Sequence, residues 1–232
     1  MGGNRLLAAL TPEDAERLRP HLEDVPMQQH QVLFEQDKPI RRAFFPHSGF
    51  ISLLSVFEDG PSIDTATVGA EGVIGIPLFV NDEPSPSRAV VQVPGRASMI
   101  AAEPLRQAMA ESPHLRSLFD CYTHAFLAQV LQTVACNAIH STEERMAKWL
   151  LMSADRTNGE SIPLTHEFLA EMLGVGRPTV SLIARTLQTA GLIKYRRGLI
   201  DIIDRAGLED VTCPCYRAIR GAYGRLLPLT YK

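Results

Sequence analysis

The 232-residue sequence has no apolar run long enough to cross a bilayer, and its N-terminus does not show the charged-then-apolar pattern of a secretory signal. It contains only four cysteines, which are too few and too scattered for the disulfide framework of a secreted protein. These absences predict a cytoplasmic protein that has no membrane partner.

Common catalytic motifs are also missing. We find no Gly-x-Ser-x-Gly nucleophile elbow, no Walker phosphate-binding loop and no His-Glu-x-x-His zinc motif. A cupin-like metal site needs about two or three histidines and a carboxylate, whereas residues 26–100 contain only His30 and His47. The sequence therefore predicts that the protein is not an enzyme, and it leaves a cupin-like ligand- or metal-binding protein as an alternative.

Two of the cysteines, Cys213 and Cys215, form a Cys-x-Cys motif. Such a motif can bind metal or act as a redox pair, but we find no second pair of cysteines or histidines at zinc spacing. We therefore interpret both cysteines as structural or incidental and predict no metal site.

The charge of the chain is unevenly distributed. The net charge is −3, which by itself disfavours nucleic acid as a partner. However, residues 1–140 carry 16 acidic and 10 basic side chains, whereas residues 141–232 carry 10 acidic and 13 basic ones. An acidic N-terminal part and a basic C-terminal part are typical of a regulator that contacts DNA through its C-terminal part.

Residues 164–204 predict two short helices followed by a β-hairpin. Thr165 is a suitable cap for the first helix, and Gly174 is suited to end it in the left-handed conformation. A second amphipathic helix and two strands with the basic turn 196–198 follow. This order is typical of a winged helix-turn-helix, which binds DNA or, as an alternative, serves only for protein contact. The polar face of the second helix bears no acidic residue, as entry into a groove beside phosphates requires.

The N-terminal part predicts a jelly roll. A helix is expected to begin at Thr11 and Pro12, and the segment that contains it is expected to end at Pro26. Short strands separated by turn residues are then expected at 31–34, 42–45, 50–56, 62–68 and 88–93.

A long helix is expected after Ser112 and Pro113, of about 27 residues and roughly 40 Å. Its apolar residues alternate at spacings of three and four, which predicts the seam of a two-stranded coiled coil, with a buried helix of a monomer as the alternative. The seam residues are Leu115, Phe119, Tyr122, Phe126 and Val130. His140 and Ser141 are the expected hinge, and Ser141 with Glu144 forms a capping box.

The DNA-binding segment carries a family resemblance. The chain resembles the cyclic-AMP receptor protein/FNR (CRP/FNR) regulators in three short stretches. They are Leu164-Thr165, Met172-Leu173-Gly174-Val175-Gly176-Arg177-Pro178-Thr179-Val180-Ser181 and Gly191-Leu192-Ile193. The resemblance implies an α+β protein with a cyclic-nucleotide-binding-like jelly roll at 1–110, a dimerisation helix at 111–140 and a winged helix-turn-helix at 141–232. It also implies a homodimeric transcription regulator whose partners are double-stranded DNA with a palindromic operator and RNA polymerase.

The same resemblance implies roles at DNA. The expected phosphate contacts are Thr165, His166, Thr179, Arg185, Arg196 and Arg197. The expected base contacts are Arg177, Pro178, Ser181 and Leu182. The family usually has Glu where this chain has Pro178 and a second Arg where it has Leu182. We therefore predict a half-site that differs from the family's usual one and has more A·T character at those positions.

The effector cassette departs from the family pattern. In cyclic-nucleotide-binding members a Phe-Gly-Glu element holds the ribose and an Arg-Ser/Thr-Ala element holds the phosphate, but here Gly75 is followed by Ile76 and Pro77. Arg88 and Ala89 stand one residue out of place, and with Gly75 and Ile76 they are the expected effector pocket. Because the carboxylate is missing, we do not expect cyclic AMP to bind. An iron–sulfur cluster lacks its N-terminal cysteines, and the seven histidines single out no haem ligand, so no cofactor is predicted.

Overall fold

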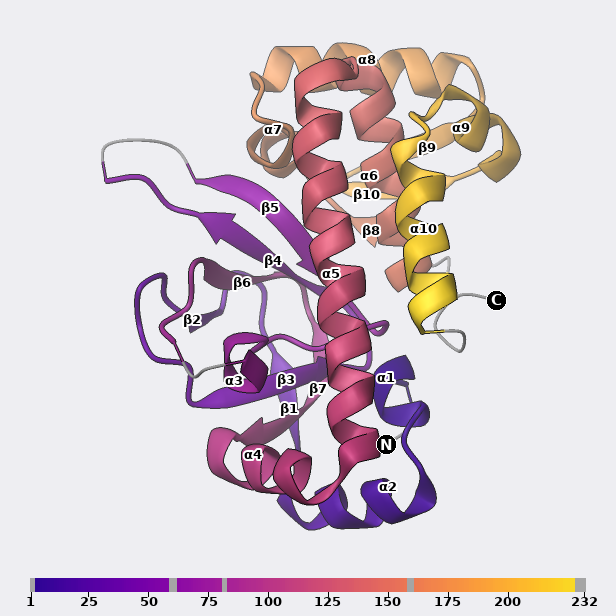
Figure 1. Ribbon diagram of the computed structural model, residues 1–232. Coiled ribbons are helices and arrows are strands. Elements are labelled where there is room, and N and C mark those ends of the chain that lie inside the picture. The colour runs from indigo at the N-terminus through magenta and orange to yellow at the C-terminus, as the bar shows by residue number, and fades with distance from the viewer. Residues whose placement is uncertain (1–2, 59–61, 81–82, 158–160, 228–232) are drawn as a thin grey trace.

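The computed structural model describes residues 3–58, 62–80, 83–157 and 161–227. Figure 1 shows a β-rich N-terminal part, a long helix α5 that runs beside it, and a mainly helical C-terminal part gathered around the upper end of α5. This arrangement confirms the predicted fold: a β-rich N-terminal region, a long helix and a C-terminal helix-turn-helix.

The N-terminal segment begins with the short helices α1 (Arg5–Ala8), α2 (Pro12–Leu18) and η1 (Arg19–His21). The hydroxyl of Thr11 accepts a hydrogen bond from the backbone N–H of Asp14, which confirms the predicted helix start. Helix α1 was not predicted. The buried side chain of Asn4 caps it and also donates to the carbonyls of Pro46 and Gly72, so α1 is attached to the β-rich part.

The β-rich part consists of two antiparallel sheets. One has the order β1-β7-β3, made of β1 (Glu23–Met27), β7 (Gly95–Ala101) and β3 (Arg42–Pro46). The other has the order β2-β6-β4-β5, made of β2 (Val32–Phe34), β6 (Arg88–Val93), β4 (Phe50–Ser55) and β5 (Ile63–Val68). An apolar cluster with residues from both sheets, including Phe44, Ile51, Val91 and Met99, fills the space between them.

All five predicted strands are present, but two strands were missed. Strand β1 contains Pro26, where the N-terminal segment was expected to end, and β7 begins at Gly95, within the expected Pro94-Gly95 turn. Proline is tolerated in β1 because β1 is at the edge of its sheet, where a missing N–H leaves no partner unsatisfied.

Three helices follow the strands: α3 (Pro77–Val80), α4 (Ala102–Glu111) and α5 (Pro113–Ile139). The hydroxyl of Ser112 caps α5, as predicted. Helix α5 packs on the β-rich part of its own chain. The Tyr122 hydroxyl donates to the carbonyl of Val73 at 2.8 Å, and the Gln129 amide donates to the carbonyl of Thr67 at 2.9 Å.

This packing corrects the expected coiled-coil seam. Leu115, Phe119 and Tyr122 are at most 1% exposed, because they contact the jelly roll of the same chain, and they are therefore unavailable to a second chain. Phe126 and Val130 are half-buried. The exposed apolar side chains of α5 form a different set: Leu127, Leu131, Val134 and Ile139.

The C-terminal part begins with α6 (Thr142–Arg156), whose Ser141–Glu144 capping box is confirmed. It continues with β8 (Ile162–Pro163), α7 (His166–Leu173), α8 (Arg177–Thr189), β9 (Ile193–Arg196), β10 (Leu199–Ile202), α9 (Arg205–Val211) and α10 (Cys215–Leu226). The small sheet has the order β8-β10-β9. Helix α10 packs along α5, so the end of the chain returns to the long helix (Figure 1).

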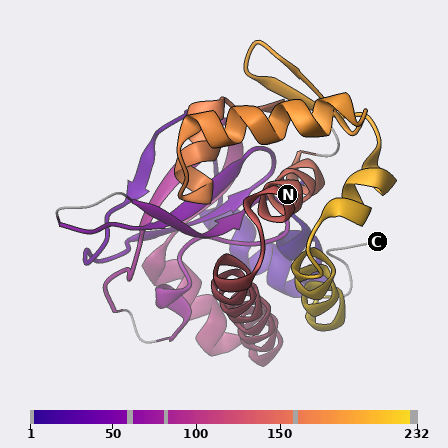
Figure 2. The ribbon, with the colours of Figure 1, turned by 90° about the horizontal axis from the view of Figure 1, so that it is seen from above.

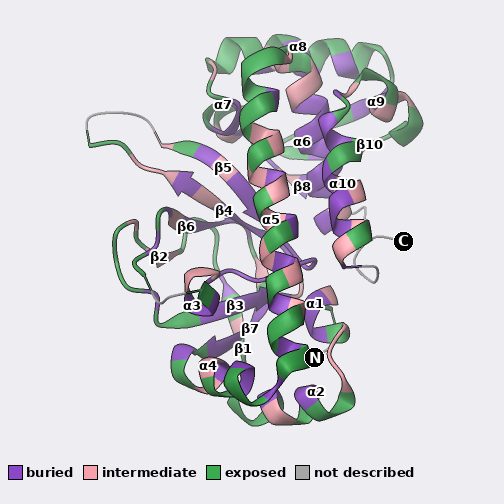
Figure 3. Ribbon diagram, viewed as in Figure 1, coloured by how far each residue is buried: buried purple, intermediate pink, exposed green. Residues whose placement is uncertain are grey.

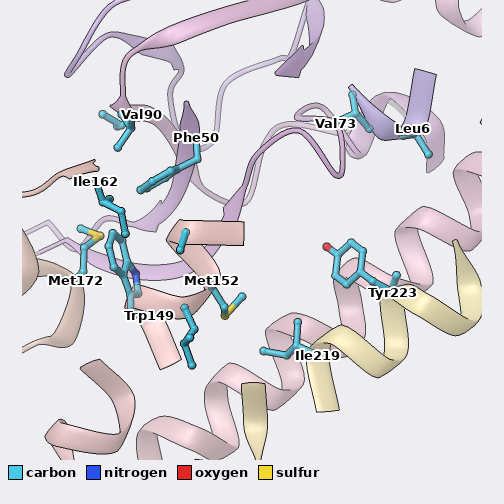
Figure 4. Close-up of a cluster of buried hydrophobic side chains, with 14 of the residues drawn as sticks. Leu6, Phe50, Val73, Val90, Trp149, Met152, Ile162, Met172, Ile219 and Tyr223 are labelled. Carbon is cyan, nitrogen blue, oxygen red and sulfur yellow. The ribbon is translucent and has the colours of Figure 1, made fainter. Parts of the chain in front are cut away.

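The two parts share one apolar core, which Figure 4 shows in close-up. Phe50 of β4 meets the edge of Trp149 on α6, with ring centroids 5.6 Å apart, and Trp149 makes a similar contact with Phe168 of α7. Aromatic pairs of this geometry add to the stabilisation from apolar burial. The helix-turn-helix is therefore held against the β-rich part.

A buried ion pair crosses the same interface. The guanidinium of Arg156 on α6 lies 2.8 Å from the carboxylate of Glu71, and both side chains are 2% exposed. Arg156 also donates to the carbonyl of Thr67 at 2.9 Å, and Glu71 accepts from the backbone N–H of Gly69. Nearby, burial raises the pKa of Asp64 to about 6, although a hydrogen bond from Ser52 and the charge of Arg156 act in the opposite direction.

Among the described residues, no helix combines the length and the apolar character that a membrane span requires.

Candidate nucleic-acid interface and internal pocket

Helices α7 and α8 form the predicted helix-turn-helix. Thr165 accepts from the backbone N–H of Phe168 and caps α7, and Gly174 ends α7 at φ 65° and ψ 38°. This left-handed conformation favours glycine, as the sequence analysis expected. Helix α8 lies across the outer end of the molecule, and the β9–β10 hairpin projects beside it (Figure 2).

Helix α8 has one buried and one exposed face. Val180, Ile183, Ala184 and Leu187 pack into the core, as their spacing predicted. The opposite face is mostly solvent-exposed (Figure 3) and contains no acidic residue. Arg177 and Arg185 are exposed on it, and Leu182 is 65% exposed. Exposed basic and apolar side chains without carboxylates suit a helix that enters a groove between phosphates.

Arg177 occupies the first position of α8. Its guanidinium lies 3.7 Å from the carboxylate of Glu167 on α7, and both side chains are more than two-thirds exposed. A surface ion pair of this kind contributes little to stability. The guanidinium is therefore able to exchange this contact for a base edge, for which its two parallel N–H donors fit guanine O6 and N7.

His166 and Ser181 are placed differently from the expectation. The Nδ1 atom of His166 lies 2.9 Å from the hydroxyl of Ser181, and its ring stacks on Tyr195 of β9 at 4.2 Å. Burial and the neighbouring charge of Arg177 lower the pKa of His166, which favours the uncharged ring. His166 thus joins α7, α8 and the hairpin, and Ser181 is half-buried beneath it.

The hairpin has the predicted basic tip. Arg197 at φ 49° and Gly198 at φ 81° form its two-residue turn, and Arg196 precedes them. Two residues with positive φ match the right-handed twist of the flanking strands. The side chain of Gln188 on α8 accepts from the backbone N–H of Tyr195 at 2.8 Å, which fixes the hairpin beside α8. Arg196 and Arg197 are exposed, and so is Thr179 near the start of α8.

A pocket of about 650 Å³ lies between the β-rich part and α5. Its lining comes from β2, β4, β5, residues within 73–80 and 83–87, and α5. Most of it is apolar, for example Phe34, Leu53, Ile76, Phe126 and Val130. Among the described residues, no lysine, arginine or histidine lines this pocket, and Glu83 is the one ionisable residue in its lining.

The predicted effector residues separate into two groups. Gly75 and Ile76 line the pocket. Arg88 and Ala89 are not among its lining residues, because the Arg88 guanidinium forms a 2.6 Å ion pair with Glu35 at the surface and Ala89 is buried between the sheets. The expectation that all four residues share one site was therefore wrong for Arg88 and Ala89.

The structure brings together four residues that the sequence analysis kept apart. Cys213 and Cys215 lie beside Cys136 and His140 at the end of α5, and their ligand atoms are all within 4.8 Å of one another. The available signal was the four-residue spacing of Cys136 and His140, which places both on one face of a helix. By contrast, among the described residues His30 and His47 belong to no group of three metal-ligating side chains.

Comparisons with known proteins agree with the order of the parts. The family model of the cyclic nucleotide-binding domain matches residues 25–112, and that of the Crp-like helix-turn-helix domain matches residues 144–211. The chain is 25% identical over 217 residues to the global nitrogen regulator of Synechocystis sp., covering 89% of this chain and 96% of that protein.

Solved structures show the same fold. FixK2 from Bradyrhizobium japonicum superimposes with a TM-score of 0.72 at 17% identity, covering 83% of this chain and 98% of that one. The regulator CLP of Xanthomonas campestris, described as c-di-GMP responsive, gives a TM-score of 0.66 at 16% identity, covering 83% and 99%. Both domain models occur in one chain, in the family's order and around one long helix, and the relatives are regulators rather than enzymes. The chain therefore belongs to the CRP/FNR family of transcription regulators.

Proposed function

We propose that this protein is a homodimeric, sequence-specific DNA-binding regulator that acts on transcription in the cytoplasm, together with RNA polymerase, and that its pocket does not bind cyclic AMP. The single observation that carries DNA binding is the exposed face of α8, which presents Arg177 and Arg185 and no acidic residue. Its functional units are the effector domain 1–110, the dimerisation helix 111–140 and the DNA-binding domain 141–232.

The dimer interface we propose is the exposed apolar stripe of α5. Leu127, Leu131 and Val134 are 52%, 61% and 64% exposed and are separated by four and three residues. Apolar residues at this alternating spacing form the contact between two helices of a coiled coil. Two copies joined along α5 would present two α8 helices to the half-sites of a palindromic operator.

Base reading rests on Arg177, Pro178 and Leu182. Arg177 is assigned to a guanine, whereas exposed Pro178 and Leu182 offer only apolar contacts. Apolar side chains in the major groove contact the methyl group of thymine, which supports A·T pairs opposite these two residues. Ser181 and His166 are assigned to positioning, because each is held by the other. Phosphate contacts are assigned to Thr165, Thr179, Arg185, Arg196 and Arg197.

Replacing Arg177 is the direct test of DNA reading. We expect Arg177→Ala to weaken binding to a duplex selected from a random pool by about 5- to 150-fold, equivalent to about 1–3 kcal/mol, and to relax the preference at one base pair. Fluorescence anisotropy with matched and single-substituted duplexes measures both quantities. Arg185→Ala should instead weaken all duplexes alike and lower the salt slope by about one.

Arg19→Ala is the matched control, because Arg19 is exposed and directly follows α2, which lies at the opposite end of the molecule from α8 (Figure 1). Equal affinity of Arg177→Ala and wild type would contradict the DNA-reading role and favour a winged helix used only for protein contact. Selection of the family's usual half-site would contradict the roles of Pro178 and Leu182.

The effector pocket is suited to an uncharged or largely apolar ligand. A cyclic nucleotide would bring a phosphate into a pocket whose described lining residues contain no cation and include the Glu83 carboxylate. Burying an anion without a partner costs several kcal/mol.

We therefore expect calorimetric titration with cyclic AMP to give no saturable heat. Arg88→Ala should behave like the wild type in this experiment, because the Arg88 side chain is paired with Glu35 away from the pocket. Stoichiometric binding of cyclic AMP that Arg88→Ala abolishes would show that the pocket rearranges around that arginine.

A further inference from the structure

Four metal-ligating side chains meet where α5 ends and α10 begins. Cys136 lies near the end of α5, His140 is its C-cap residue, Cys213 follows α9 and Cys215 is the first residue of α10. The Sγ atoms of Cys136 and Cys213 are 3.5 Å apart, and the Cys215 Sγ is 3.5 Å from Nδ1 of His140.

The fold places these residues together from distant parts of the chain. Cys136 and His140 are one turn apart on the same face of α5, and α10 packs along that helix. The Cys213-Pro214-Cys215 segment turns the chain into α10 directly opposite, so residues 75 and 77 positions apart become neighbours. All three cysteines are at most 1% exposed, and together they form a separate cluster from the apolar core.

We propose that Cys136, His140, Cys213 and Cys215 form a tetrahedral site for a single zinc ion. Three thiolates and one imidazole are a common donor set of structural zinc sites. With Zn–S bonds of about 2.3 Å, the ligand atoms of a tetrahedral site are separated by roughly 3.8 Å. The two separations of 3.5 Å and the overall limit of 4.8 Å match that size.

The distances between the four ligand atoms are too short for an iron–sulfur cluster. In a [4Fe–4S] cluster each thiolate binds a different iron atom, so the whole cluster lies between the ligands. Four ligand atoms within 4.8 Å of one another leave room for one ion.

The surroundings support a metal-bound state of the thiolates. The Gln132 amide donates a hydrogen bond to the Cys215 sulfur at 3.1 Å, an outer contact that orients a ligand. Lys148 of α6 is 6% exposed and lies close enough to Cys136 for its ammonium to interact with that sulfur. Zinc with three thiolates and a neutral imidazole carries one negative charge, which a buried ammonium offsets.

The site would join the dimerisation helix, the hinge and the C-terminal helix. His140 is one of the two residues between α5 and α6, so a metal bound there would restrain the angle at which the DNA-binding domain leaves α5. This inference does not depend on the proposed DNA specificity, because metal binding is measured without DNA.

The test is the metal content of the full-length protein purified under reducing, metal-free conditions and then supplied with zinc. Inductively coupled plasma mass spectrometry should find about one zinc ion per chain. Cys213→Ser and Cys215→Ser should lose the bound zinc, and Cys121→Ser, which removes the half-buried cysteine of α5 outside the cluster, should keep it. In place of zinc, Co²⁺ should give the thiolate charge-transfer and visible bands of a tetrahedral site in the wild type and in Cys121→Ser.

Circular dichroism checks the folding of each variant. If a serine variant does not fold, competition for zinc between the wild-type protein and a chromogenic chelator shows by itself whether the protein binds the ion. A wild-type protein that binds no zinc under these conditions would overturn the proposal. So would a Cys136–Cys213 disulfide that forms quantitatively in the presence of zinc, or bound iron with the absorption of an iron–sulfur cluster.

Discussion

Arg156→Met should lower the free energy of unfolding by about 3–5 kcal/mol, the usual cost of leaving one member of a buried ion pair without its partner. Without the guanidinium, Glu71 would keep only its hydrogen bond from the Gly69 N–H among the contacts described above, and the carbonyl of Thr67 would lose a donor. Trp149 is the only tryptophan of the chain and lies at the same interface, so its fluorescence in urea reports the transition at a fixed protein concentration.

Arg88→Met is the matched control for this prediction. It makes the same substitution in an ion pair whose side chains are 35% and 47% exposed, and exposed pairs contribute about 0–1 kcal/mol. The double variant Glu71→Gln/Arg156→Met should recover part of the stability, because it no longer buries an isolated charge. Equal unfolding curves for Arg156→Met and Arg88→Met would show that the buried pair does not hold the two parts together.

Leu131→Asp should separate the proposed dimer and weaken binding to a palindromic operator by about 100-fold or more. A carboxylate in the centre of the apolar stripe of α5 would be buried without a partner in the dimer, whereas Leu131 is 61% exposed in the single chain. Losing the second half-site removes the gain in affinity that comes from linking two binding units. Light scattering after gel filtration measures the mass, and anisotropy measures the affinity.

Gln107→Asp places the same carboxylate on an exposed position of α4, a helix that does not carry the stripe, and it should leave mass and affinity unchanged. The fold of the Leu131→Asp chain should be retained, because the side chain contributes to no core of its own chain. A dimeric Leu131→Asp protein would place the interface elsewhere.

Local signals predicted most of the secondary structure. Caps such as Thr11, Ser112 and Ser141 act within one helical turn, and the Arg197-Gly198 turn acts between adjacent strands, so their effect is visible in a short stretch of sequence. Strands β1 and β7 were not predicted because the proline and glycine near their ends usually mark turns rather than strands. Pro26 is tolerated only because β1 is at the edge of its sheet.

The sequence by itself determined the order of the parts, the helix-turn-helix with its hairpin and the exposed face of α8, because each depends on the spacing of residues within one element. Only the tertiary structure decided which face of α5 is free, that Arg88 is turned away from the pocket, and that Glu71 and Arg156 form a buried pair. The same holds for the Cys136, His140, Cys213 and Cys215 cluster. The physical reason is that the spacing of apolar residues shows that a helix has an apolar face, but it does not show which part of the protein, or which second chain, packs against that face. Contacts between residues 75 or more positions apart depend on how whole elements pack.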